Sequence, residues 1–371
     1  MRGLLVATGI AIVLAVFWDA FETLILPRRV ARRVRLTRIL FRSTWWIWRA
    51  VARGVRRPQR RENFLSFYGP LSILFLLGVW AFGMILGFTV VYEAARVRPG
   101  GSHGFLTLLY LSAGSFFTLG LGDVAPASSL ARATTAVEAG TGLTFLALVI
   151  AYLPVLYQAF SRREVRISLL DQRAGSPPSA GELLGRRGAV WQESGARQLR
   201  DWELWAAELL ESHLSYPLLA LFRSQHDNQS WVAALTVTMD ACALIITGVD
   251  GISDTQARLT FAMARHAAVD LASTLGFAPL PPDPDRLPAE DLLRLRELLA
   301  RRGLALAAGD DADEVLAELR ESYEPYVNGL ARRLLMPLPS WLPADGATDN
   351  WEVTAWETRS GRRARRDVIG S

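Results

Sequence analysis

The chain has 371 residues, of which 51% are hydrophobic, and a formal net charge of +5. The apolar residues are clustered in long runs, which indicates a membrane protein and argues against a wholly soluble one. All 41 cationic side chains are arginines, which we ascribe to codon usage. The single cysteine, Cys242, excludes an intramolecular disulfide and a cysteine metal cluster. We therefore expect the soluble part of the chain to lie in the cytoplasm, a reducing compartment.

The first apolar run covers residues 3–26 and is long enough to cross a bilayer as a helix. A signal peptide is the alternative, but the run exceeds the usual apolar core of a signal peptide, and no small-residue cleavage site follows it. We expect a retained transmembrane helix over residues 1–27. Asp19 and Glu22 share one face near the end of this helix, which places them within reach of Arg28 or Arg29.

Residues 28–65 form a basic connection. Between Arg28 and Arg61 there are 13 arginines and no acidic residue, so the positive-inside rule places this connection in the cytoplasm and the N-terminus outside. Interleaved tryptophans are typical of a helix that lies at the lipid headgroups. We expect residues 28–61 to bind anionic lipids; nucleic acid is disfavoured as a partner because the segment is held at the membrane surface.

Residues 70–92 and 133–157 are two further apolar runs long enough to span the bilayer. Arginines follow the second run, so the same rule returns the chain to the cytoplasm. Residues 231–249 are apolar enough to be mistaken for another span. Asp240 lies at the centre of this stretch and no basic cluster flanks it, so we expect a buried helix of a soluble domain.

The rest of the C-terminal region has amphipathic helical patterns. We expect a linker over residues 167–181, a cytoplasmic helical domain over 182–338 and a disordered tail over 339–371. The region lacks a nucleotide-binding glycine fingerprint, metal-ligand histidine spacing and a nucleophile with its base. These absences predict neither an enzyme nor a cofactor, and an unidentified cytoplasmic regulator is a candidate partner of the domain.

The segment between the second and third spans carries the strongest functional signal. Residues 104–117 are typical of a helix too short to cross the membrane, and they lead directly into Thr118, Leu119, Gly120, Leu121, Gly122 and Asp123. Non-helical backbone at membrane depth is tolerated where it is buried in protein or lines a watery path. Alternating glycines allow successive carbonyls to face one axis, where a ring of them can replace the hydration shell of a cation. A tight turn between spans is the alternative interpretation.

The run Thr-x-Gly-x-Gly-Asp, preceded by a short helix and followed by Pro126, resembles the pore signature of potassium channels. The resemblance covers residues 66–166. It implies an all-α membrane protein whose pore module has an outer helix over 70–92, a pore helix over 104–117, a filter over 118–123 and an inner helix over 133–157. This module follows the extra N-terminal transmembrane helix, and the cytoplasmic helical domain follows the module.

The same resemblance implies a homotetramer in the plasma membrane that conducts potassium, the one metal ion expected, through the filter. The family usually has Val and Tyr where this chain has Leu119 and Leu121, and often Glu where it has Gly114. A poorly selective pore, or a non-conducting scaffold or sensor whose C-terminal domain binds a protein, is therefore the alternative. The first span and the C-terminal region also resemble those of uncharacterised bacterial channel-like proteins.

Residues around the filter receive further candidate roles. In related channels the inner helix bends at small residues or proline, which makes Gly140, Gly142 and Pro154 candidate gating positions; close helix packing is the alternative for the glycines. Three aromatic residues are candidates for the wall around the filter, namely Tyr110, Phe116 and Phe117. Glu138 is an ionisable residue inside a span, and we expect it to support the pore helix or to act as a packing residue.

Overall fold

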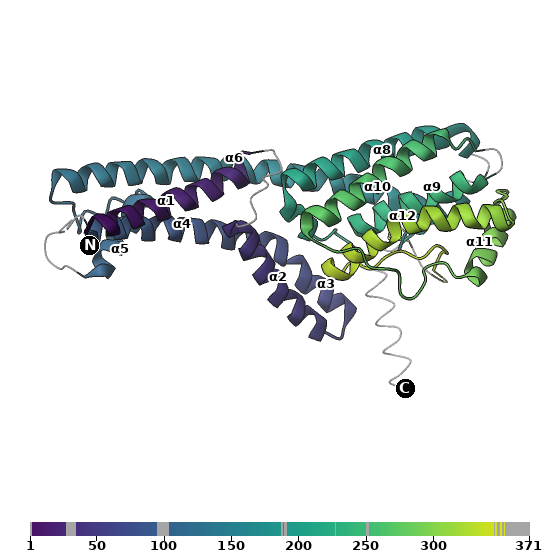
Figure 1. Cartoon of the computed structure of the whole chain (residues 1–371), viewed down its shortest axis with the longest axis horizontal. Helices are drawn as coiled ribbons and strands as arrows, with labels where there is room; N and C mark the ends of the chain where they lie inside the picture. The colour runs from purple at the N-terminus through teal and green to yellow at the C-terminus, as the bar shows by residue number, and fades with distance from the viewer. Residues whose placement is uncertain are drawn as a thin grey trace. The chain divides into compact units, whose positions relative to one another are not determined.

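A computed structural model of the chain divides it into two compact units, Met1–Gln158 and Ala159–Ser371 (Figure 1). It describes residues 2–26, 35–94, 104–186, 188, 191–226, 228–249, 252–344, 346, 349–350 and 352. Regular structure in these residues is helical, apart from isolated bridges such as that between Val249 and Leu306. The prediction of an all-α membrane protein with a pore module is confirmed for the described residues.

Four of the described helices are long and apolar enough to cross a membrane. They are α1 (Arg2–Leu24), α4 (Tyr68–Ala94), α6 (Ser129–Ala174) and α9 (Trp231–Gly248). Protein buries 83% of the apolar window of α9, but only 22% of that in α1 and 17% of that in α6. The helices of the first unit thus expose apolar surface suited to lipid, whereas α9 is covered by the second unit.

In the first unit, α1 runs along α4 (Figure 1). The two helices approach closely because glycines stand at their contact: a Cβ atom on Gly9 would lie 2.7 Å from the carbonyl oxygen of Gly87, and one on Gly83 would lie 2.9 Å from Val16. Small residues permit this approach inside a membrane. The core beside this contact surrounds Trp80 and includes Phe116 of the short helix α5 (Phe105–Phe116).

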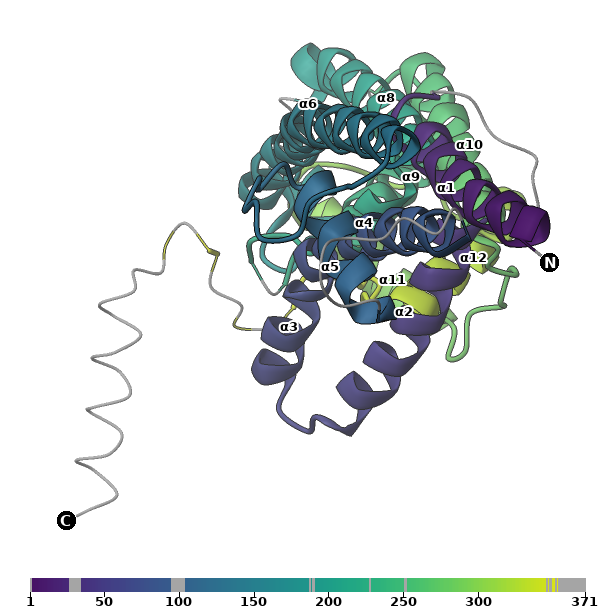
Figure 2. The ribbon, with the colours of Figure 1, turned by 90° about the vertical axis from the view of Figure 1, so that its left-hand side faces the viewer.

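The basic connection is folded over its described part. Helices α2 (Leu36–Gly54) and α3 (Pro58–Ser66) lie side by side (Figure 2), and Trp48 of α2 stacks on Phe64 of α3 with ring centroids 4.3 Å apart. The linker predicted over 28–65 is therefore a helical hairpin from residue 36 onward. Aromatic contacts between the two helices, which a basic composition does not reveal, explain the difference.

The acidic residues of α1 meet α2 and α4. Asp19 accepts hydrogen bonds from the Trp80 indole at 2.9 Å and from the Thr37 amide at 3.2 Å, near the start of α2. Glu22 lies 3.5 Å from Arg35. The expected partners Arg28 and Arg29 lie outside the described residues.

The inner helix is longer than the predicted 133–157. Helix α6 begins at Ser129 and continues through Pro154 to Ala174, so the linker predicted over 167–181 is wrong for residues 167–174. Leu170 and Ala174 are buried within the second unit. Between Pro154 and Gly175 the sequence has no proline or glycine, and Gly175, whose φ is +86°, follows the last helical residue.

The second unit is a helical assembly centred on α9. Its other helices are α7 (Ala180–Gly185), α8 (Trp191–Ser215), the short 3₁₀ helix η2 (Pro217–Leu221), α10 (Thr255–Leu275), α11 (Ala289–Arg301) and α12 (Asp310–Leu334). Helix α10 packs against α8, α9 and α12. The Ser230 hydroxyl accepts a hydrogen bond from the Ala233 amide and so caps α9. Every residue from Trp231 to Ile246 is buried.

The disordered tail predicted over 339–371 is wrong in its first part. The Trp341 side chain is buried and its carbonyl accepts the Gly181 amide hydrogen at 2.9 Å. Further along, Asp349 pairs with Arg186 at 2.7 Å. Aromatic burial and ion pairing hold this segment, and residues 353–371 lie outside the described residues.

Candidate functional site

The candidate filter follows α5 directly. Thr118, Gly120 and Gly122 have φ angles of +54°, +61° and +79°, and the two leucines between them do not have positive φ. Alternating signs of φ turn successive peptide groups so that their carbonyls can share one side of the strand. A left-handed φ is strained for a β-branched residue, so surrounding structure must hold Thr118 in place. This backbone can present a row of carbonyl oxygens to a cation.

The filter of a single chain is uncovered. All residues from Thr118 to Asp123 are exposed, with Leu119 at 59% and Leu121 at 62%. Among the described residues, no group of three or more His, Cys, Asp or Glu side chains is placed to hold a metal ion.

The acidic residue after the filter is held from the pore helix. The Tyr110 hydroxyl donates to Asp123 Oδ2 at 3.0 Å, and Asp123 Oδ1 accepts the Val124 amide hydrogen at 3.1 Å. Tyr110 stands one helical turn before Gly114, the position at which a glutamate is common in the resembled family. A tyrosine hydroxyl thus links helix α5 to Asp123, the last residue of the candidate filter.

The aromatic residues at the end of α5 have different surroundings. Phe116 is buried and its ring lies 5.8 Å from that of Phe145 on α6, whereas Phe117 is exposed beside the filter. Phe116 thus anchors the pore helix within its own chain. Phe117 and Tyr110 are the aromatic candidates left on the side of the filter.

The two glycines of the inner helix also differ. A Cβ atom on Gly142 would lie 1.9 Å from the Phe116 carbonyl oxygen, whereas one on Gly140 would meet nothing within 4 Å. Gly142 therefore lets α6 pack directly against the end of the pore helix, and Gly140 faces open space in the single chain. Pro154 lies inside α6, which continues beyond it.

Glu138 lies behind the pore helix with no exposed surface. Its Oε2 atom is 2.5 Å from the Tyr92 hydroxyl of α4, and its Oε1 atom contacts the Ser112 hydroxyl of α5. One side chain thus connects the outer helix, the pore helix and the inner helix. Sequence analysis singled out Glu138 but missed Tyr92 and Ser112; their signal was polarity within apolar segments.

Comparisons with known proteins agree with this geometry. A protein-family model described as "Ion channel" matches residues 73–158. A Bacillus subtilis (strain 168) protein named "Uncharacterized membrane protein YdjJ" is 24% identical over 221 residues, which are 55% of this chain and 60% of that relative. The chain thus spans less than two thirds of the length of the curated relative. No solved structure matches the chain significantly. Residues 73–158, which include the short helix α5 and the candidate filter, are thus the part of this chain that is similar to ion channels.

Proposed function

We propose that the protein is a homotetrameric cation channel that conducts potassium passively through residues 118–123. The alternation of left-handed φ at Thr118, Gly120 and Gly122 carries this proposal, because it lets successive carbonyls replace the water around an ion. Each chain has one such loop, so four chains are needed to surround an ion. Exposure of Leu119 and Leu121 in the single chain supports burial by neighbouring copies.

Electrostatics favour a cation along this path. The C-terminal end of α5 carries the partial negative charge of the helix dipole and lies directly before the filter. Asp123 is exposed at the other end of the filter, where it would attract cations. The positive-inside rule places the basic hairpin, and with it the domain after α6, on the cytoplasmic side of the plasma membrane.

The α2 helix is the proposed lipid-binding element. It exposes Trp46 (66%) and Ile47 (57%). Arg42 and Arg53, four and seven residues from Trp46, are exposed on the same side of the helix as Trp46, and Arg38 is exposed one turn before Arg42. An apolar stripe flanked by arginines matches the boundary between acyl chains and anionic headgroups. In liposomes, replacing Trp46 and Ile47 with serine should reduce the dependence of flux on anionic lipid. An unchanged lipid dependence would contradict this role.

Ion flux into liposomes that contain the purified protein tests the channel proposal. The expected result is potassium flux well above sodium flux, and its loss in Gly120→Asp. Equal fluxes of the two ions would mean that Leu121, which lacks the tyrosine hydroxyl of related filters, leaves the pore poorly selective. No flux under any voltage, pH or lipid composition would favour a scaffold or sensor whose C-terminal domain binds a regulator.

A further inference from the structure

The contacts of Glu138 contain information on its protonation. Its polar partners are the hydroxyl groups of Tyr92 and Ser112, and within the described residues no arginine forms an ion pair with it. A buried carboxylate without a cation or several donors is strongly unfavourable. The number of hydrogens that these hydroxyls can donate therefore decides whether an ionised or a protonated Glu138 is compatible with the observed contacts.

Each hydroxyl has one hydrogen to donate. The Ser112 hydroxyl lies 2.9 Å from the carbonyl oxygen of Ile85, an atom that can only accept a hydrogen. The Thr135 hydroxyl donates in the same way to the Ala131 carbonyl oxygen at 2.9 Å. Ser112 and Thr135 therefore have no hydrogen left for further contacts.

Three of the oxygen–oxygen contacts around the carboxyl group still require hydrogens: Ser112 with Glu138, Tyr92 with Glu138, and Tyr92 with Thr135 at 3.1 Å. Tyr92 also hydrogen-bonds with Ser115, whose hydroxyl donates to the Leu111 carbonyl oxygen at 2.8 Å. With an ionised Glu138, the single Tyr92 hydrogen can serve only one of its own contacts, such as that with Glu138 or that with Thr135, and the contact between Ser112 and Glu138 has no hydrogen at all. A protonated Glu138 adds a second hydrogen. It can donate from Oε1 to Ser112 while its Oε2 accepts from Tyr92, which satisfies both contacts of the carboxyl group.

We propose that Glu138 is a positioning residue held as a neutral carboxylic acid, which donates a hydrogen bond to Ser112 and thereby fixes the pore helix in its conducting position. Ser112 lies on the pore helix six residues before Thr118, the start of the filter. Loss of this bond would free the helix to shift and would disturb the row of carbonyls that it supports. The flux readout of this inference rests on the proposed channel function.

Glutamine at position 138 mimics the neutral acid, because its amide can donate to Ser112 and accept from Tyr92. Glu138→Gln should keep flux within about twofold of wild type, whereas Glu138→Ala leaves both hydroxyls without this partner and should lower flux by about tenfold or more. Flux in Glu138→Gln as low as in Glu138→Ala would overturn the proposal, because it would show that the ionised carboxylate is required.

Infrared spectroscopy of the full-length protein in lipid tests the protonation without relying on conduction. At neutral pH, the wild type should show the carbonyl stretch of a protonated carboxylic acid, and Glu138→Gln should lack that band. Absence of this difference band would refute a neutral Glu138 even if flux behaves as expected. If the wild-type protein shows the band but conducts no ions, the result would support a protonated Glu138 and contradict the proposed channel function.

Discussion

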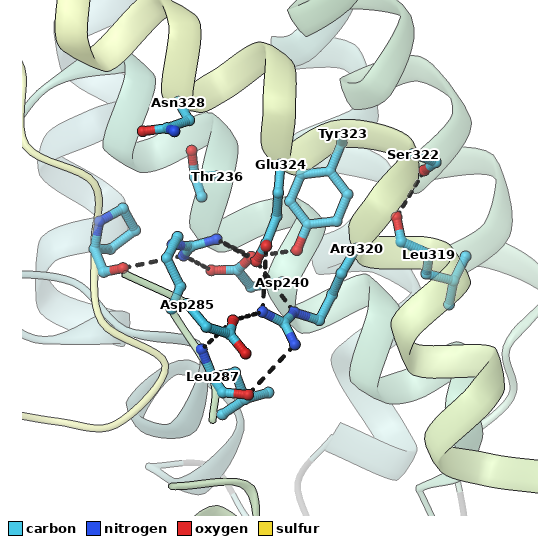
Figure 3. A network of polar contacts seen from close by, with 12 residues as sticks. Thr236, Asp240, Asp285, Leu287, Leu319, Arg320, Ser322, Tyr323, Glu324 and Asn328 are labelled. Atoms are coloured by element: carbon cyan, nitrogen blue, oxygen red, sulfur yellow. Dashed lines mark hydrogen bonds and ion pairs between the residues drawn. The ribbon is translucent and has the colours of Figure 1, made fainter. Parts of the chain in front are cut away.

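The two units each bury a carboxylate within an apolar stretch of a helix, but its partners differ. Glu138 in α6 contacts hydroxyl groups. Asp240 in α9 lies 2.6 Å from the Arg286 guanidinium, and it accepts a hydrogen bond from the Tyr323 hydroxyl (Figure 3). Neither side chain is exposed. The pair between Asp240 and Arg286 can form only when the segment that carries Arg286 packs against α9. The partner of the central acid, rather than hydropathy, distinguishes the core helix α9 from a span.

Asp240 belongs to a larger network in the second unit. Arg286 also pairs with Glu324 of α12 at 3.0 Å and donates to the Pro339 carbonyl oxygen at 3.0 Å. Burial lowers the pKa of Arg286, but the charge and hydrogen bond of Asp240, together with the charges of Tyr323 and Glu324, more than offset this effect, and the net pKa is raised above the usual value. The guanidinium lies 5.6 Å from the Trp341 ring centroid. The network thus ties α9 and α12 to the segment that follows α12.

Removing the central acid of α9 should have the largest effect. Asp240→Ala leaves the buried Arg286 without its closest anion, which should lower the free energy of unfolding by about 3–5 kcal/mol. Denaturant titration followed by tryptophan fluorescence measures this change. Arg258→Ala, which breaks an exposed pair with Asp254, is the control and should cost less than about 1 kcal/mol. Equal losses in the two variants would contradict a structural role for the network.

The close contact between Gly142 of α6 and Phe116 of α5 in the first unit provides the next test. Gly142→Ala places a methyl group against the Phe116 carbonyl, so α6 or the pore helix must shift. Flux should therefore fall by about tenfold or more, which corresponds to a change of about 1.4 kcal/mol or more in a free energy. Gly140→Ala adds the same methyl group in open space and should leave flux close to wild type. The opposite ranking would favour Gly140 as the hinge of the inner helix.

A smaller effect is expected from pH on the second unit. Burial, followed by the charge of Arg163 at 3.3 Å, lowers the pKa of His213 well below its ordinary value of 6.5. The unfolded chain therefore takes up a proton that the folded chain excludes. Stability from this residue is complete above pH 6.5 and falls by about 1.4 kcal/mol per pH unit below it.

Unfolding titrations from pH 7.5 down to about pH 5.5 should show this slope in the wild type and a reduced slope in His213→Gln. His266→Gln is the matched control, since the His266 side chain is exposed. A wild-type slope retained in His213→Gln would assign the acid sensitivity to other groups.

Sequence reasoning predicted the apolar helices, the short helix before residue 118 and the buried nature of α9, because hydropathy and a central Asp are local signals. The role of residues 118–123 as a filter stays a prediction. Sequence reasoning did not predict the Ser112 and Tyr92 partners of Glu138, or the hydrogen bond from Tyr110 to Asp123. These contacts depend on how separate helices pack. The same limit explains the errors at both ends of the second unit, where burial of Leu170 extends α6 and burial of Trp341 orders the segment after α12.

The most direct test of the account compares two glycines that both have positive φ and open surroundings. Gly120 in the filter has φ +61°, and Gly303 in the second unit has φ +81°. Replacing either with alanine imposes a similar backbone cost of about 1 kcal/mol. Potassium flux in liposomes should be lost in Gly120→Ala and preserved in Gly303→Ala. Undiminished flux in Gly120→Ala would contradict a carbonyl filter at residues 118–123.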